Sequence, residues 1–260
     1  MAKAKVELVA ELNAPGGGAW QGAVHDDVTG EWFMAHSLGS GDGKIHRFGI
    51  SDKIRKPYLD TMILKDHTHV YGFGVRDRLI WTGWDDAAEG NDIVTIPYKG
   101  GKTVRKSAAK ELHVFTDEPC QVSMSVTGSR VVIMETLNNN TVYRFTKRRT
   151  ADVLANKDEA LGKVISVPRG DSDEQWLQGF TLAGDFLYLC WGRTNEKAWI
   201  DKYSFTSGKQ VGSVDITSAG YLPGEVKDNR EPEGMDGHTF GVKVHEGSER
   251  VLRIYKLTNF

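Results

Sequence analysis

The chain has 260 residues, of which 39% are hydrophobic and 26% charged, enough to bury the core of one large all-β domain or of two small ones. Its 33 basic residues are offset by 35 acidic ones, and the net charge of −2 argues against electrostatic capture of nucleic acid or of an anionic membrane. The longest apolar run, Phe186–Trp191, is too short to span a membrane. Cys120 and Cys190 lie far apart and without CxxC spacing, so we expect free thiols rather than a disulfide framework or a zinc site.

The first patterned segment is Lys5–Leu12, which alternates apolar and polar residues as a half-buried β-strand does. The N-terminus includes no continuous apolar stretch of the kind that a secretion signal requires, so no signal peptide is expected. The glycines at 16–18 follow this segment. We interpret them as a flexible turn rather than a phosphate-binding loop, because the rest of that motif is missing.

From Trp20 onward, one strand-start pattern recurs along the chain at nearly even spacing. Its five copies are Trp20-Gln21-Gly22, Val70-Tyr71-Gly72, Cys120-Gln121-Val122, Leu177-Gln178-Gly179 and Pro232-Glu233-Gly234. A second β-rich run follows each copy at 31–36, 78–84, 130–135, 185–191 and 240–244, and a third at 45–48, 93–96, 142–145, 200–203 and 252–255. Such self-similarity is the signature of a repeat architecture.

Fourth strands are predicted in the first four units, at 58–64, 103–115, 162–167 and 210–216. The fifth unit reaches the end of the chain after its third strand, and Lys5–Leu12 has no other partner, so this segment is predicted to be the outer strand of the last unit. The sequence therefore predicts one all-β domain over residues 1–260, a five-bladed β-propeller closed by its N-terminal strand. A β-sandwich with accidental spacing is the alternative, and only residues 150–161 suggest a short helix or loop.

Antiparallel strands run alternately up and down, so the starts of the first strands and the ends of the second strands lie at the same end of each blade. We expect a ligand site on that face. Its predicted hydrogen-bonding groups are Gln21, Tyr71, Gln121, Gln178, Glu231 and Glu233, and its predicted rim contacts are Trp84, Trp191 and His36. Trp32 and Trp81 are expected to pack between blades instead.

This combination of side chains suits a carbohydrate. Amides and carboxylates bind sugar hydroxyls, and exposed indole faces cover the C–H surface of a pyranose. The alternative is that the glutamines bond backbone groups near the axis and tie neighbouring blades together.

Glu231 and Glu233 beside Arg230 form the densest cluster of functional residue types. The two carboxylates are compatible with acid–base chemistry, with holding a cation, or with an ion pair to Arg230. No GxSxG, HExxH or P-loop motif occurs, and His67 and His69 alone are a weak metal signal. We therefore expect no cofactor and no metal site.

Several short motifs carry a resemblance to a known family: Arg230-Glu-Pro-Glu-Gly-Met235 with Ile254–Lys256, Leu177–Phe180, and Trp20–Ala23 followed by Ile45–Phe48. From about Trp20 to Lys256 the chain resembles the five-bladed propellers of receptor-binding proteins in phages of Gram-positive bacteria. Helveticin-like bacteriocins and proteins called teichoic acid biosynthesis protein C belong to the same group.

The resemblance implies a virion tail or baseplate protein that recognises a cell-wall glycopolymer, such as a sugar-decorated teichoic acid, without turnover. Its partners would be that glycan and other tail proteins, with no nucleic acid and no membrane insertion, and an oligomer is compatible with the sequence. The expected location is the virion, or the medium after lysis, and the cytoplasm if the gene is not a phage gene. A glycan-active or phosphoester-active enzyme, or a helveticin-like bacteriocin, using Glu231 or Glu233 is the alternative.

Overall fold

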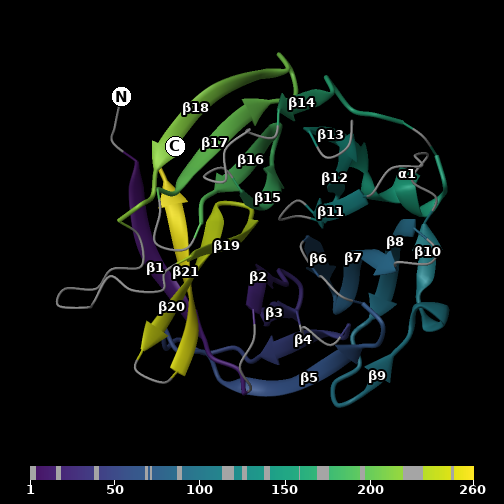
Figure 1. Cartoon of the computed structure of the whole chain (residues 1–260), viewed down its shortest axis with the longest axis vertical. Helices are drawn as coiled ribbons and strands as arrows, with labels where there is room; N and C mark the ends of the chain where they lie inside the picture. Colours follow the sequence, from purple (N-terminus) through teal and green to yellow (C-terminus); the bar gives the residue numbers. More distant parts are fainter. Residues whose placement is uncertain are drawn as a thin grey trace.

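The computed structural model describes residues 4–15, 19–37, 41–67, 70, 72–86, 90–112, 120–124, 128–137, 141–157, 159–168, 176–193, 197–218, 231–246 and 249–260. Five β-sheets are arranged as blades around a central axis, as Figure 1 shows. The predicted five-bladed β-propeller is confirmed. No helix in the described ranges is long and apolar enough to cross a membrane.

Each blade is numbered by its order along the chain, and its strands are given from the axis outwards. Blade one has β2 (Ala19–His25), β3 (Trp32–Ser37), β4 (Gly43–Phe48) and β5 (Tyr58–Leu64), with β9 (Thr103–Val104) added in parallel outside β5. Blade two has β6 (Phe73–Arg76), β7 (Leu79–Asp86), β8 (Gly90–Pro97) and β10 (Lys110–Leu112). Blade three has β11 (Cys120–Met124), β12 (Arg130–Leu137), β13 (Val142–Arg149) and β14 (Ile165–Pro168).

Blade four has β15 (Leu177–Ala183), β16 (Phe186–Trp191), β17 (Trp199–Ser204) and β18 (Lys209–Asp215). Blade five has β19 (Glu231–Asp236), β20 (Thr239–Glu246), β21 (Glu249–Thr258) and β1 (Lys5–Leu12). Within the described ranges, the helical segments are the 3₁₀ turn Lys106–Ala108 and α1 (Thr150–Leu154), which lies within the segment predicted as a helix or loop.

The N-terminal strand closes the last blade as predicted. β1 pairs antiparallel with β21, from Lys5 opposite Thr258 to Leu12 opposite Leu252. The pairing covers the edge of β21 that would otherwise expose unpaired backbone groups.

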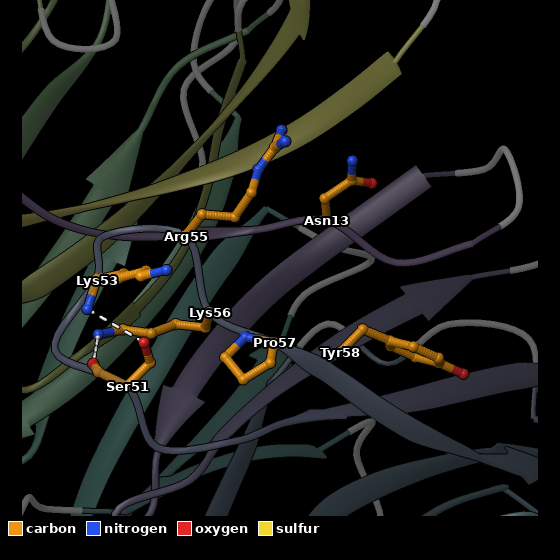
Figure 2. Close-up of a pocket in the computed structure, with 7 residues that line it drawn as sticks. All are labelled: Asn13, Ser51, Lys53, Arg55, Lys56, Pro57 and Tyr58. Atoms are coloured by element: carbon orange, nitrogen blue, oxygen red, sulfur yellow. Dashed lines mark hydrogen bonds between the residues drawn. The ribbon is translucent and has the colours of Figure 1, made fainter.

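A connection from blade one secures this closing strand on its other side. The connection is residues 49–57, between β4 and β5, which passes beside the end of β1 (Figure 2). Glu11 donates its backbone N–H to the Ile54 carbonyl (2.8 Å) and accepts one from Lys56 (3.0 Å). Arg253 of β21, almost fully buried, donates Nε–H to the Glu11 carboxylate (3.1 Å). The closing strand is therefore held by both blades that it joins.

The described apolar side chains form five core clusters, each between two neighbouring blades. On β3, Phe33 packs toward blade two while Trp32 and Met34 pack toward blade five. Alternate side chains of a strand point to opposite faces of its sheet, so both sets are buried. Trp81 likewise packs between blades two and three. The predicted inter-blade positions of Trp32 and Trp81 are confirmed.

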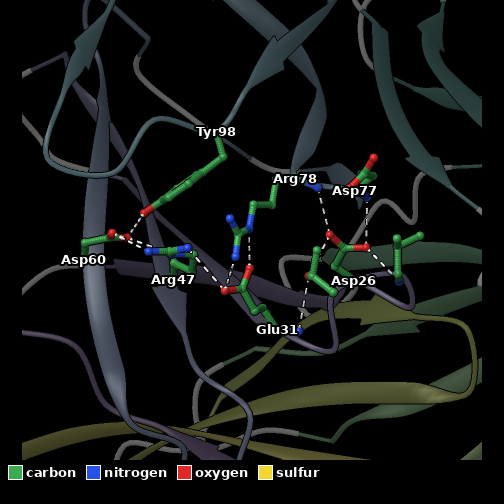
Figure 3. A network of polar contacts seen from close by, with 9 residues as sticks. Asp26, Glu31, Arg47, Asp60, Asp77, Arg78 and Tyr98 are labelled. Carbon is green, nitrogen blue, oxygen red and sulfur yellow. Dashed lines mark hydrogen bonds and ion pairs between the residues drawn. The ribbon is translucent and has the colours of Figure 1, made fainter.

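Polar groups tie blades one and two together at the end where the β2–β3 and β6–β7 turns lie (Figure 3). The Asp26 carboxylate accepts backbone N–H groups from Asp77 (3.0 Å) and Arg78 (2.8 Å), which have positive φ in the β6–β7 turn. Burial favours the protonated form of Asp26, but these backbone donors together hold its pKa below the ordinary value. Asp26 also closes its own turn, since its carbonyl accepts the Gly30 N–H (2.7 Å), as expected for a hairpin connection.

A chain of side chains extends this tie outwards. Glu31 accepts two hydrogen bonds from Arg78 (2.7 and 2.8 Å) and one from Arg47 (3.2 Å). Arg47 also donates two to Asp60 (3.0 and 2.6 Å), which accepts a third from the Tyr98 hydroxyl (2.7 Å). Each carboxylate has a cationic partner, so this cluster stabilises the junction of the two blades.

One strand prediction was wrong in detail. The segment 103–115 was predicted as the outer strand of blade two, but its first part, β9, pairs with β5 of blade one and only β10 joins blade two. The cause is a set of backbone hydrogen bonds across the two blades, from Ile63 N to Lys102 O (2.9 Å) and from Lys65 N to Val104 O (2.8 Å).

Candidate functional site

The face at which the innermost strands begin is built as the sequence predicts. The register places Trp20 opposite His36, Cys120 opposite Glu135 and Leu177 opposite Trp191. The start of each first strand thus lies beside the end of the second strand. We call this end of the ring the strand-start face.

Glycine backbones of three blades meet directly behind the polar strand-start residues. A Cβ atom on Gly234 would lie 2.6 Å from the Cα of Gly22, and one on Gly179 would collide with the backbone of Gly234. Only glycine permits this approach of the inner strands of blades four, five and one. The recurring Gly of the motif therefore has a structural role, which is close packing near the axis.

Gln21 and Gln178 are the extra residues of β-bulges that precede these glycines. Both side chains are half-buried. Gln178 donates its amide N–H to the carbonyl of Gly192 (3.1 Å), at the end of the second strand of its own blade. Gln178 therefore bonds a backbone group of its own blade, in line with the alternative that the glutamines bond backbone groups near the axis.

The three predicted rim contacts are not on the surface. Trp84 and His36 have no exposed surface, and Trp191 is 4% exposed. Trp84 belongs to the core between blades one and two, and Trp191 to the core between blades three and four. The expectation of exposed rims was wrong because the second strand of each blade is covered on both faces by neighbouring blades.

His36 instead belongs to a buried polar chain inside blade one. Its Nδ1 lies 3.2 Å from Nε2 of His46, whose Nδ1 lies 2.7 Å from the Thr61 hydroxyl. Burial lowers the pKa of His36 to about 4, with Lys44 contributing, and that of His46 to about 3. Both imidazoles are therefore neutral at pH 7.

Glu233 is buried and forms an ion pair with Lys243 of the adjacent strand (3.0 Å). It also lies near Cys190, a buried free thiol whose pKa is raised by burial and, second, by the Glu233 charge. Removal of either partner of such a buried pair would leave an uncompensated charge in blade five. A role of Glu233 in ligand binding stays a prediction. Arg230, whose ion pair was one of the alternatives for these carboxylates, lies outside the described residues.

Three other predicted site residues are not described in full. Tyr71 lies outside the described residues, as do the side chains of Gln121 and Glu231. Their backbones place Gln121 at the second position of β11 and Glu231 at the first of β19. Their roles in binding stay predictions.

Trp176, which the sequence analysis missed, is the large aromatic residue exposed at the start of blade four. Its side chain is 47% exposed, and its carbonyl accepts the Gly192 N–H (3.0 Å). The Arg193 guanidinium lies 4.9 Å from the Trp176 ring centroid, a cation–π contact. Lys197 lies 5.7 Å from the ring of Trp199. We call these four residues, Trp176, Arg193, Lys197 and Trp199, the blade-four cluster.

The position of Trp176 was available in the sequence, since it immediately precedes the fourth copy of the strand-start motif. The blade-four cluster offers an indole surface and two cations on the strand-start face. Such a surface can pack against sugar C–H groups and attract an anion. In the described parts of the chain, His, Cys, Asp and Glu side chains form no group of three that could hold a metal ion.

Comparison with known proteins gives the family. The model of the phage five-bladed β-propeller receptor-binding platform domain matches residues 21–246. The chain belongs to this family. The family resemblance inferred from the strand-start motifs is thereby confirmed.

Two relatives extend this picture of the phage platform family. A Bacillus subtilis (strain 168) protein named "Putative major teichoic acid biosynthesis protein C" is 28% identical over 76% of this chain and 49% of its own length. The tail fiber of Staphylococcus aureus phage P68 superposes with a TM-score of 0.76 over 97% of this chain and 52% of the fiber chain, at 17% identity. The second likeness shows the fold. The chain spans about half the length of each relative.

Proposed function

We propose that this platform domain recognises an anionic glycopolymer of the bacterial cell wall, of the teichoic acid type, through its strand-start face. The observation that carries the proposal is the blade-four cluster, in which the exposed Trp176 ring lies against the Arg193 guanidinium on that face. The family assignment and the name of the Bacillus subtilis relative support the choice of ligand.

The chemistry of the blade-four cluster fits such a polymer. The exposed face of the Trp176 indole packs against the C–H surface of a sugar ring. Arg193 and Lys197 supply hydrogen-bond donors and positive charge for phosphate groups. Gln21, half-buried at the start of blade one, adds an amide that can bind a hydroxyl group. We propose binding without turnover.

The proposed location is the virion, where other tail proteins would hold the platform. Several copies on one particle would raise the avidity for a repetitive polymer without any new contact within each site. A low affinity of the single domain is therefore compatible with firm attachment of the particle.

Substitution of the blade-four cluster tests the proposal. Trp176→Ala together with Arg193→Gln should weaken binding of the purified protein to polymer-bearing cell walls at least tenfold, because an aromatic anchor and a charge are lost. Val211→Ala, an exposed apolar change at the outer edge of the same blade, should leave binding unchanged. Binding that survives the double substitution, or release of sugar or phosphate from the walls, would contradict the proposal.

A further inference from the structure

A row of residues crosses blade four on the face that packs toward blade five. The strand register sets Tyr188 of β16 opposite Lys202 of β17, and Lys202 opposite Gly212 of β18. Side chains of directly opposite residues in antiparallel strands lie on the same face of the sheet. Because Gly212 has no side chain, the row leaves a gap at the outer strand, and a glycine inside a strand often marks the close approach of another group.

The ring of Phe260 fills this gap. A Cβ atom on Gly212 would lie 3.1 Å from Cε2 and 3.4 Å from Cζ of the Phe260 ring. The centroids of the Phe260 and Tyr188 rings are 6.2 Å apart, and Nζ of Lys202 donates a hydrogen bond to the Phe260 backbone oxygen (2.9 Å). Figure 1 shows this end of the chain beside β17 and β18. A residue that follows the third strand of blade five is therefore seated on blade four.

Aromatic rings surround the ammonium of Lys202. Its Nζ lies 4.5 Å from the ring centroid of Phe186, 5.5 Å from that of Tyr188 and 5.6 Å from that of Phe260. A cation within about 6 Å of an aromatic ring centroid is attracted to the face of the ring. We call Phe186, Tyr188, Lys202 and Gly212 the Lys202 site. It contacts both the ring and the backbone oxygen of the residue that it holds.

The contact with the Lys202 site is separate from the strand pairing of blade five. The β1–β21 ladder ends with Lys5 opposite Thr258. Asn259 follows with a φ of 61°, a left-handed conformation that asparagine adopts more readily than most other residues. Phe260 can therefore leave the Lys202 site without breaking a pair of that ladder.

We propose that the Lys202 site is a binding site for an aromatic residue, and that its occupation by Phe260 forms a releasable clasp between blades four and five. The closing strand β1 joins blade five to the connection of blade one, whereas the clasp joins blade five to blade four. Release of Phe260 uncovers two rings and an ammonium, which can then bind the same residue supplied from outside the chain. The clasp does not depend on the proposed recognition of a glycopolymer.

A peptide titration of the Phe260→Ala variant tests the proposal. The probe is the acetylated pentapeptide Lys-Leu-Thr-Asn-Phe, which has the sequence of residues 256–260. It should cause saturable NMR shifts of the backbone amides of Lys202 and Gly212, with a Kd on the order of 1 mM for one weak contact. The same peptide ending in alanine should cause none, and wild type, whose site is occupied, should respond at least tenfold less at equal peptide concentration. Equal responses of wild type and variant, or no shifts at these amides, would overturn the proposal.

Gly212→Ala tests the clasp without any peptide. The backbone of Gly212 is not left-handed, so the added Cβ acts only by competing with the Phe260 ring for space. Gly212→Ala should therefore lower the Tm of wild type by about 2–4 °C through overpacking. In the Phe260→Ala background the ring is gone, and Gly212→Ala should change the Tm by less than about 1 °C. An equal loss in both backgrounds would mean that the alanine disturbs β18 itself, and would overturn the clasp.

Discussion

At the scale of single residues, the glycines near the axis impose the tightest constraint in the ring. Gly234 has a φ of 67° and meets the backbone of Gly22. We predict that Gly234→Ala lowers the free energy of unfolding by the cost of a left-handed alanine, about 1–2 kcal/mol, and by a further ~1–3 kcal/mol from overpacking. Urea denaturation of wild type and variant measures the loss.

Gly101 supplies a matched control for this prediction. Its φ is 69°, nearly that of Gly234, but an added Cβ would meet nothing within 4 Å. Gly101→Ala should therefore show only the left-handed cost. Equal destabilisation by the two substitutions would mean that the contact between inner strands does not matter.

The buried histidines predict how stability depends on pH. Burial lowers the pKa of His36 to about 4 and that of His46 to about 3, from an ordinary 6.5. Below about pH 6.5 the two imidazoles bind protons in the unfolded chain but stay neutral in the folded chain. The free energy of unfolding should therefore fall from pH 6.5 towards pH 4. Burial raises the pKa of Asp236 to about 7. This shift has the opposite effect on stability, because the folded chain then binds a proton more readily than the unfolded chain does.

A variant separates the histidine contribution from that of the carboxyl groups. His36→Gln with His46→Gln should be less stable than wild type at pH 7, since a buried packing arrangement is disturbed. Its stability should nevertheless decline less between pH 6.5 and pH 4, as measured by urea unfolding at several pH values. An unchanged slope would show that these imidazoles titrate normally.

The residue scale is also where the sequence was least informative. Trp84 and Trp191 end second strands, and the strand pattern predicts their end of the blade correctly. It does not predict exposure. Both faces of a blade are buried, so the alternation of side chains along a strand does not separate buried from exposed positions. Trp176 immediately precedes a strand, and its side chain is 47% exposed.

At the scale of elements, the closing strand β1 carries the clearest prediction. Glu11 bonds Arg253, which is 1% exposed, while Glu7 of the same strand is exposed. Glu11→Ala should cost about 1.5–3 kcal/mol of unfolding free energy, the value of a hydrogen bond to a charged group. Glu7→Ala should change the free energy of unfolding by less than ~0.5 kcal/mol. Equal losses for the two variants in denaturant titrations would argue against a stabilising role of the Glu11–Arg253 contact.

The elements themselves were largely predictable. The segment 58–64 coincides with β5, and 210–216 differs from β18 by one residue at each end. The departure of β9 to blade one was not predictable, because a two-residue strand carries no periodicity and its partner is decided by backbone hydrogen bonds between blades.

At the scale of the whole molecule, five copies of one motif were sufficient to predict the number of blades, and the closing strand followed from β21 having an unpaired edge. Ring closure explains why each apolar cluster lies between blades rather than within one. The ligand was not predictable from the ring, because propellers with the same architecture carry many chemistries.

The proposed binding of a cell-wall glycopolymer by this platform is tested by measuring how the purified protein binds Gram-positive cell walls before and after that polymer is chemically removed. We expect saturable binding to untreated walls of a susceptible strain, competition by the free polymer, and loss of binding to stripped walls. Equal binding to stripped and untreated walls would contradict it.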